Sequence, residues 1–105
     1  MASYLLPIMR ITKYRNGSPV NKVNIEIFCA PNCNRCERAV ILVKKVIAEI
    51  GENSVQWRKV DVVEEIDYAV GLGIRATPAI VMNGILVFTA LPGKAILNKK
   101  ITELL

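Results

Sequence analysis

Two cysteines separated by two residues stand where an apolar run meets a helical pattern, and this junction constrains the fold more than any other feature. The pair is Cys33 and Cys36. An alternating run of β-branched residues predicts a strand over 23–28 just before it. Apolar residues at helical spacing predict a helix over 34–50 just after it. A Cys-x-x-Cys pair at the start of a helix is typical of redox sites.

The rest of the chain continues to alternate between strand and helix patterns. Strands are predicted over 55–60, 79–82 and 85–89, and helices over 63–72 and 95–105. In the first of these two helices, Ile66, Ala69 and Val70 are expected to face inward. Asn83-Gly84 is a strong hairpin signal, whereas the first two strands need a parallel crossover. The order β-α-β-α-β-β-α therefore indicates an α/β fold with a central mixed sheet of about four strands.

Length and composition indicate a single domain. The chain has 105 residues, of which 52% are apolar and 22% charged. We assign 1–20 to an N-terminal extension that can add an edge strand, and 21–105 to the domain. Scattered positive charge and few aromatic residues argue against nucleic-acid binding. No apolar run reaches the length of a membrane span, and the first residues lack a signal-peptide pattern.

The three cysteines of the chain bear on its location and on the chemistry of the pair. An odd number of cysteines favours a reducing compartment, so we expect a cytoplasmic protein. We also expect it to act as a monomer. Cys33 should lie in the first turn of the helix, where free backbone N–H groups and the helix dipole favour a thiolate. Arg35 and Arg38 are candidates for lowering its pKa further. Cys36, one turn deeper, is placed to resolve a mixed disulfide without a cofactor.

A second candidate segment, Ala76-Thr77-Pro78, stands directly before the hairpin. A proline at the start of a strand costs no interior ladder bond, and X-Pro is the only common route to a cis peptide bond. We expect a cis bond before Pro78, with unpaired backbone groups next to it. An extended client chain can hydrogen-bond there, so these three residues form the predicted substrate-binding segment.

From residue 23 to 105 the chain resembles the thioredoxin and glutaredoxin superfamily, and most of all the small glutaredoxin-like thioredoxins of archaea. The motifs that carry the resemblance are Cys33-Asn34-Arg35-Cys36, Ala76-Thr77-Pro78 and Asn83-Gly84. The resemblance implies a three-layer thioredoxin-like fold and a dithiol that reduces the disulfides of client proteins. It also implies an electron donor, either a thioredoxin-reductase-type enzyme or a low-molecular-weight thiol.

The chain departs from both branches of this superfamily. Typical thioredoxins have tryptophan at the position of Asn32 and a buried aspartate at the position of Ile27. Alternation puts Glu26 on the other strand face, either as a substitute proton carrier or as a peripheral, solvated carboxylate. The glutathione-binding motif of glutaredoxins is replaced by Leu91-Pro92-Gly93-Lys94, although Thr77 and Lys94 remain candidates for contacting a thiol carrier.

A different class of function would use Cys29 as well. Cys29, Cys33 and Cys36 form a Cys-x3-Cys-x2-Cys pattern, which resembles the cluster motif of radical S-adenosylmethionine enzymes. The chain is too short for their partial barrel, and a zinc site would lack a fourth ligand. Despite these two objections, a metal or iron–sulfur binding module that uses the three cysteines is the alternative prediction. For Cys29 alone, a buried inert thiol is the first interpretation and an auxiliary redox or metal-binding role the second.

Overall fold

The structure is a computed structural model that describes residues 22–105. The predicted extension over 1–20, with its edge strand, lies outside the described residues. The elements of the described part are β2 (Val23–Cys29), α1 (Asn34–Ile50), β3 (Val55–Asp61), α2 (Ile66–Leu72), β4 (Ala79–Met82), β5 (Ile85–Phe88) and α3 (Lys94–Leu104). Their order confirms the predicted β-α-β-α-β-β-α sequence.

The four strands form one mixed sheet in the order β3-β2-β4-β5. β2 runs parallel to β3 and antiparallel to β4, and β4 pairs antiparallel with β5 through the predicted hairpin. At the hairpin, Asn83 and Gly84 both have positive φ, 52° and 83°, which suits the tight turns that match strand twist. The Asn83 side chain also accepts a hydrogen bond from the backbone N–H of Asn24, at 2.9 Å.

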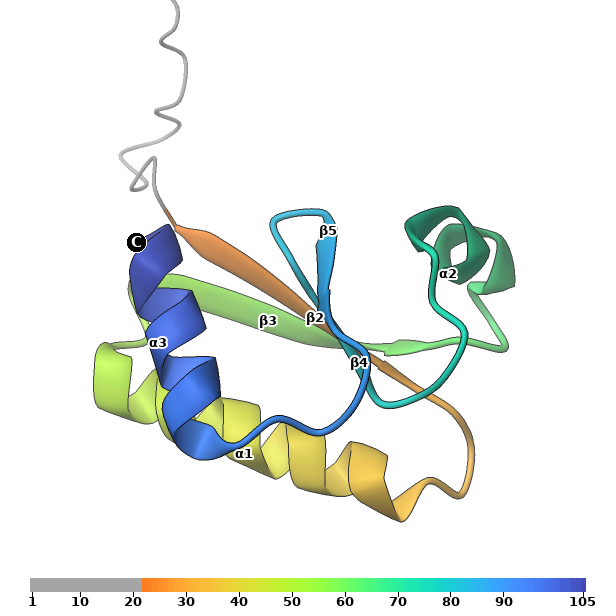
Figure 1. Ribbon diagram of the computed structural model, residues 1–105, viewed down its shortest axis with the longest axis horizontal. Coiled ribbons are helices and arrows are strands. Elements are labelled where there is room, and N and C mark those ends of the chain that lie inside the picture. The colour runs from red at the N-terminus through yellow and green to blue at the C-terminus, as the bar shows by residue number, and fades with distance from the viewer. Residues whose placement is uncertain (1–21) are drawn as a thin grey trace, which may run out of the picture.

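The sheet separates two helical layers (Figure 1). On one face, α1 and α3 cover the larger core, which the β2 residues Ile25, Ile27 and Cys29 enter from the sheet. On the other face, α2 covers a smaller apolar cluster around Phe28. Successive β2 residues thus point into different layers. No helix among residues 22–105 is both long enough and apolar enough to cross a membrane.

The largest difference from the predicted elements is at α2, which begins at Ile66 and not at residue 63. The Asp61 side chain accepts hydrogen bonds from the backbone N–H groups of Val63 and Glu64, at 2.7 and 3.3 Å, and holds a turn there. Ala69 is buried as predicted, but Ile66 and Val70 are exposed. The prediction that all three face inward was wrong, because a helix of two turns lays only a narrow stripe on the sheet.

Candidate active site

Cys33 is the N-cap of α1, and its sulfur completes the start of the helix. The sulfur accepts a hydrogen bond from the backbone N–H of Cys36, at 3.2 Å, as an N-cap side chain does for an otherwise unpaired donor. The thiol of Cys36 and this N–H group lower the pKa of Cys33 below its ordinary value, with a smaller contribution from the Thr77 hydroxyl. Cys33 is only partly buried. It is therefore an accessible thiol whose nucleophilic thiolate form is stabilised.

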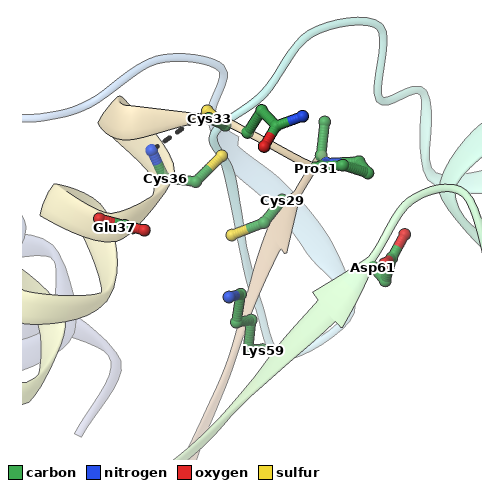
Figure 2. A pocket seen from close by; sticks show the side chains of 9 residues that line it. Cys29, Pro31, Cys33, Cys36, Glu37, Lys59 and Asp61 are labelled. Carbon is green, nitrogen blue, oxygen red and sulfur yellow. Dashed lines mark hydrogen bonds between the residues drawn. The ribbon is translucent and has the colours of Figure 1, made fainter.

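Cys36 lies one turn further along α1, behind Cys33 (Figure 2). Only 2% of the surface of Cys36 is exposed to solvent. Burial raises the pKa of Cys36, and its hydrogen bond to the Cys33 sulfur raises it further, because that bond needs the Cys36 proton. The pair thus combines an accessible sulfur with a lowered pKa and a sheltered sulfur with a raised pKa.

The two arginines proposed to tune Cys33 lie at exposed positions of α1. Arg35 contributes to the lowered pKa of Cys33 through its backbone N–H group. Arg38 lines a separate groove with Leu91 and Lys94. The observed causes of the low pKa are hydrogen bonds, and a contribution from either guanidinium group stays a prediction.

The predicted substrate-binding segment lies next to Cys33. The hydroxyl of Thr77 is 4.0 Å from the Cys33 sulfur, which it approaches as a donor. The peptide bond between Thr77 and Pro78 is cis, and Ala76 is exposed while Pro78 is buried. The structure thus brings this segment to the cysteine pair although more than forty residues separate them in sequence. Lys94, the other candidate for a thiol carrier, forms an ion pair with Glu49.

A pocket of about 180 Å³ opens beside the two cysteines, and one residue that lines it, Lys59, was not predicted from the sequence to be part of the site. Its lining includes Cys29, Cys33, Cys36, Lys59 and Asp61 (Figure 2). Lys59 aligns with Ile27 in the parallel pairing of β2 with β3, so its side chain follows Ile27 to the cysteine side of the sheet. The alternation of both strands would have indicated this, had the pairing register been known.

Glu26 is neither peripheral nor solvated. It is 6% exposed, on the face of the sheet covered by α2. Its carboxylate accepts hydrogen bonds from Arg58 at 2.9 Å and from the Tyr68 hydroxyl at 2.5 Å. Glu26 therefore belongs to a polar cluster on the side of the sheet away from the cysteines, and this placement argues against its service as their proton carrier.

The metal-binding alternative finds no support in the described part of the chain, which contains all three cysteines. No group of three or more cysteine, histidine or acidic side chains there is arranged to hold a metal ion. The iron–sulfur or zinc module that would use Cys29, Cys33 and Cys36 is therefore not formed by this geometry. All three thiols are free.

Comparisons with known proteins agree with this geometry. The family model described as thioredoxin domain matches residues 23–105. A thioredoxin of Methanocaldococcus jannaschii is 35% identical over 84 residues, covering 80% of this chain and 98% of the relative. A probable thioredoxin of Methanothermobacter marburgensis is 32% identical over 81 residues, covering 77% and 94%. Among solved structures, a mutant thioredoxin of Halobacterium salinarum superposes with a TM-score of 0.66 at 26% identity, covering 79% of this chain and 74% of that one.

Proposed function

The chain belongs to the thioredoxin family of thiol–disulfide oxidoreductases, and we propose that it reduces the disulfides of client proteins through Cys33 and Cys36. The observation that carries this assignment is the Cys33 sulfur at the N-cap of α1, with a lowered pKa and a buried thiol directly behind it. This arrangement provides one thiolate for the first attack and a second thiol in reserve.

The reaction proceeds by two exchanges. The Cys33 thiolate attacks one sulfur of the client disulfide, a mixed disulfide forms, and the other client sulfur leaves as a thiolate that takes up a proton. Cys36 then loses its proton and attacks the Cys33 sulfur, which releases the second client thiol. Two electrons have passed to the client, and Cys33 and Cys36 are joined.

The segment of Ala76, Thr77 and Pro78 positions the client in this proposal. The contact between the Thr77 hydroxyl and the Cys33 sulfur, next to the exposed residue Ala76, supports this role. An extended client strand that hydrogen-bonds to the backbone of this segment would present its disulfide to Cys33. The absence of a cofactor from the scheme follows from the chemistry, because both electrons come from the two thiols.

Donor, location and oligomeric state complete the proposal. The family implies protein-disulfide clients and a reductase as donor in general terms. We propose a thioredoxin-reductase-type enzyme or a low-molecular-weight thiol as the donor here. The odd number of cysteines supports a reducing, cytoplasmic environment, and we propose that the protein acts as a monomer.

Reduction of insulin disulfides, with dithiothreitol as donor, tests the assignment. Cys33→Ser should lower the catalysed rate, measured after subtraction of the uncatalysed background, by about 100-fold or more, because serine has no thiol and supplies no thiolate. Cys36→Ser, reduced and then mixed with insulin after removal of dithiothreitol, should instead accumulate a mixed disulfide between Cys33 and insulin, detectable by mass spectrometry. Glu65→Gln, a substitution at a half-exposed residue on the far side of the sheet, is the matched control. Wild-type-like turnover by Cys33→Ser would overturn the assignment.

A further inference from the structure

A third thiol lies behind the proposed catalytic pair. Cys29 ends β2, lines the same pocket as Cys33 and Cys36, and is 3% exposed. Figure 2 shows the Cys36 side chain between those of Cys33 and Cys29. The scheme proposed above uses Cys33 and Cys36 and leaves Cys29 without a role.

Cys36 interacts with both neighbouring thiols. Side-chain hydrogen bonds to Cys33 and to Cys29 both influence the pKa of Cys36, and the Cys36 thiol in turn influences the pKa of Cys29. The Cys29 thiol also donates a weak hydrogen bond to the backbone carbonyl of Ile27, at a sulfur–oxygen distance of 3.8 Å. The Cys36 sulfur can therefore be approached from two sides, by an accessible sulfur and by a buried one.

Resting on the proposed function, we propose that Cys29 is a third redox-active thiol, which exchanges with the Cys33–Cys36 disulfide to give a buried Cys29–Cys36 disulfide and a free Cys33. Cys29 first loses its proton to water, and its sulfur attacks the Cys36 sulfur. The Cys29–Cys36 bond forms, the Cys33–Cys36 bond breaks, and the electron pair leaves with Cys33. One disulfide replaces another, so no external oxidant or reductant is consumed.

The environments of the two outer sulfurs determine the direction and the speed of this exchange. With all three thiols reduced, the pKa of Cys29 is raised to about 12, chiefly by burial, while the charge of Lys59 opposes the increase; the burial remains when Cys36 is in a disulfide. Cys36 has no thiol proton in either disulfide, but its backbone N–H and the Thr77 hydroxyl still lower the pKa of Cys33, the leaving group. A low-pKa thiolate leaves readily, whereas a high-pKa thiol is seldom ionised. The exchange should therefore be slow but favourable, and it should keep oxidising equivalents where a protein donor cannot reach them.

Rising pH should favour the buried disulfide. The free thiol is Cys29 before the exchange and Cys33 after it, so the exchange releases a proton between their two pKa values. The ratio of the Cys29–Cys36 to the Cys33–Cys36 isomer should then rise about tenfold per pH unit in that range. The other charged groups that face these thiols are Glu37 on α1 and Lys59 and Asp61 on β3.

Differential alkylation of the oxidised wild-type protein detects the exchange directly. Free thiols are blocked with N-ethylmaleimide in denaturant, and disulfides are then reduced and labelled with iodoacetamide. Trypsin releases residues 23–35 apart from Cys36, because Arg35 precedes it, and fragment ions between Cys29 and Cys33 show which of them carries N-ethylmaleimide. We expect N-ethylmaleimide on Cys33 in part of the molecules, in a share that grows with pH. Its presence on Cys29 alone at every pH would overturn the proposal.

A variant without Cys33 isolates the second pair. Oxidised by diamide, which takes up the two electrons and two protons, Cys33→Ser should lose both remaining thiols to an intramolecular Cys29–Cys36 disulfide. The double variant with Cys29→Ala keeps a single thiol and controls for intermolecular products, and circular dichroism checks that both variants fold. Two free thiols after diamide in folded Cys33→Ser would overturn the proposal. Failure of wild type to reduce insulin would count against the proposed function alone.

Discussion

The polar groups on the two faces of β2 are buried in different surroundings. Glu26 faces α2, where Arg58 and Tyr68 satisfy its carboxylate at 2.5 to 2.9 Å. Cys29, three residues further on, faces the α1 layer, where its neighbours are other thiols and the apolar core. The face with a complete ionic cluster carries no redox group, and the face with the redox groups has no buried carboxylate among the described residues.

This difference shows what tunes the thiols. Ile27 stands where typical thioredoxins have their buried aspartate, and it is fully buried in the apolar core. The neighbouring acid, Glu26, is one residue away in sequence but across the sheet in space, since alternate residues of a strand point to opposite faces. With no buried carboxylate on this face among the described residues, the pKa of Cys33 is lowered by hydrogen bonds to its sulfur, from the thiol and N–H of Cys36 and from Thr77.

The largest expected effect comes from placing an acid on the cysteine face. Ile27→Asp should lower the free energy of unfolding at pH 7 by about 4 kcal/mol, because it removes a fully buried side chain and buries a charge. Burial raises the pKa of such an aspartate, so the folded state binds its proton more tightly than the unfolded state. Part of the lost stability should therefore return as pH falls from 7 to 5. Urea unfolding at both pH values measures this.

Ile27→Asn is the control for that experiment, because it has the same size and polarity without a titratable group. It should be destabilised as well, but without the recovery at low pH. Equal stability of Ile27→Asp at both pH values, relative to the asparagine variant, would show that this face accommodates a carboxylate as the other one does. Lys59, which aligns with residue 27 on β3, would be the partner to examine.

Local patterns predicted the framework of this fold well. The helix over 34–50, the hairpin at Asn83-Gly84 and the order of the elements rest on periodicity and turn chemistry, which act over a few residues. The nearness of Thr77 to Cys33 follows from the observed topology, since β2, which ends shortly before Cys33, pairs with β4, which begins directly after Pro78. These features depend little on the details of packing.

Other features depend on register and side-chain reach, which a single sequence does not reveal. Glu26 was expected to be peripheral or a proton carrier. It is buried instead, and its carboxylate accepts hydrogen bonds from Tyr68 on the short helix α2 and from Arg58 on β3. Lys59 joins the cysteine pocket only through the parallel register of β2 with β3. The start of α2 was misplaced because the Asp61 side chain closes a turn there.

A moderate effect should follow when the ionic cluster is weakened while the thiols are left untouched. Glu26→Gln removes the charge from two hydrogen bonds and should lower the free energy of unfolding by about 2 kcal/mol. Glu65→Gln, at a half-exposed residue that meets Arg58 only at 3.5 Å, should cost less than about 0.5 kcal/mol. The rate of Cys33 alkylation by iodoacetamide should stay at the wild-type value in both. A clear change in that rate with Glu26→Gln would show that the two faces are coupled.

The smallest expected effect concerns the hydroxyl of Thr77. The contact with the Cys33 sulfur is long, at 4.0 Å, and contributes less to the lowered pKa than the groups of Cys36 do. Thr77→Val keeps the shape and removes the donor, so the pKa of Cys33 should rise slightly. At a pH below that pKa, alkylation of Cys33 by iodoacetamide should slow about twofold, because only the thiolate reacts. Thr77→Ser retains the hydroxyl and should react at nearly the wild-type rate. Equal slowing in the serine variant would assign the effect to packing around the threonine methyl group, and the hydrogen-bond account of Cys33 tuning would then rest on Cys36 and the backbone N–H of Arg35.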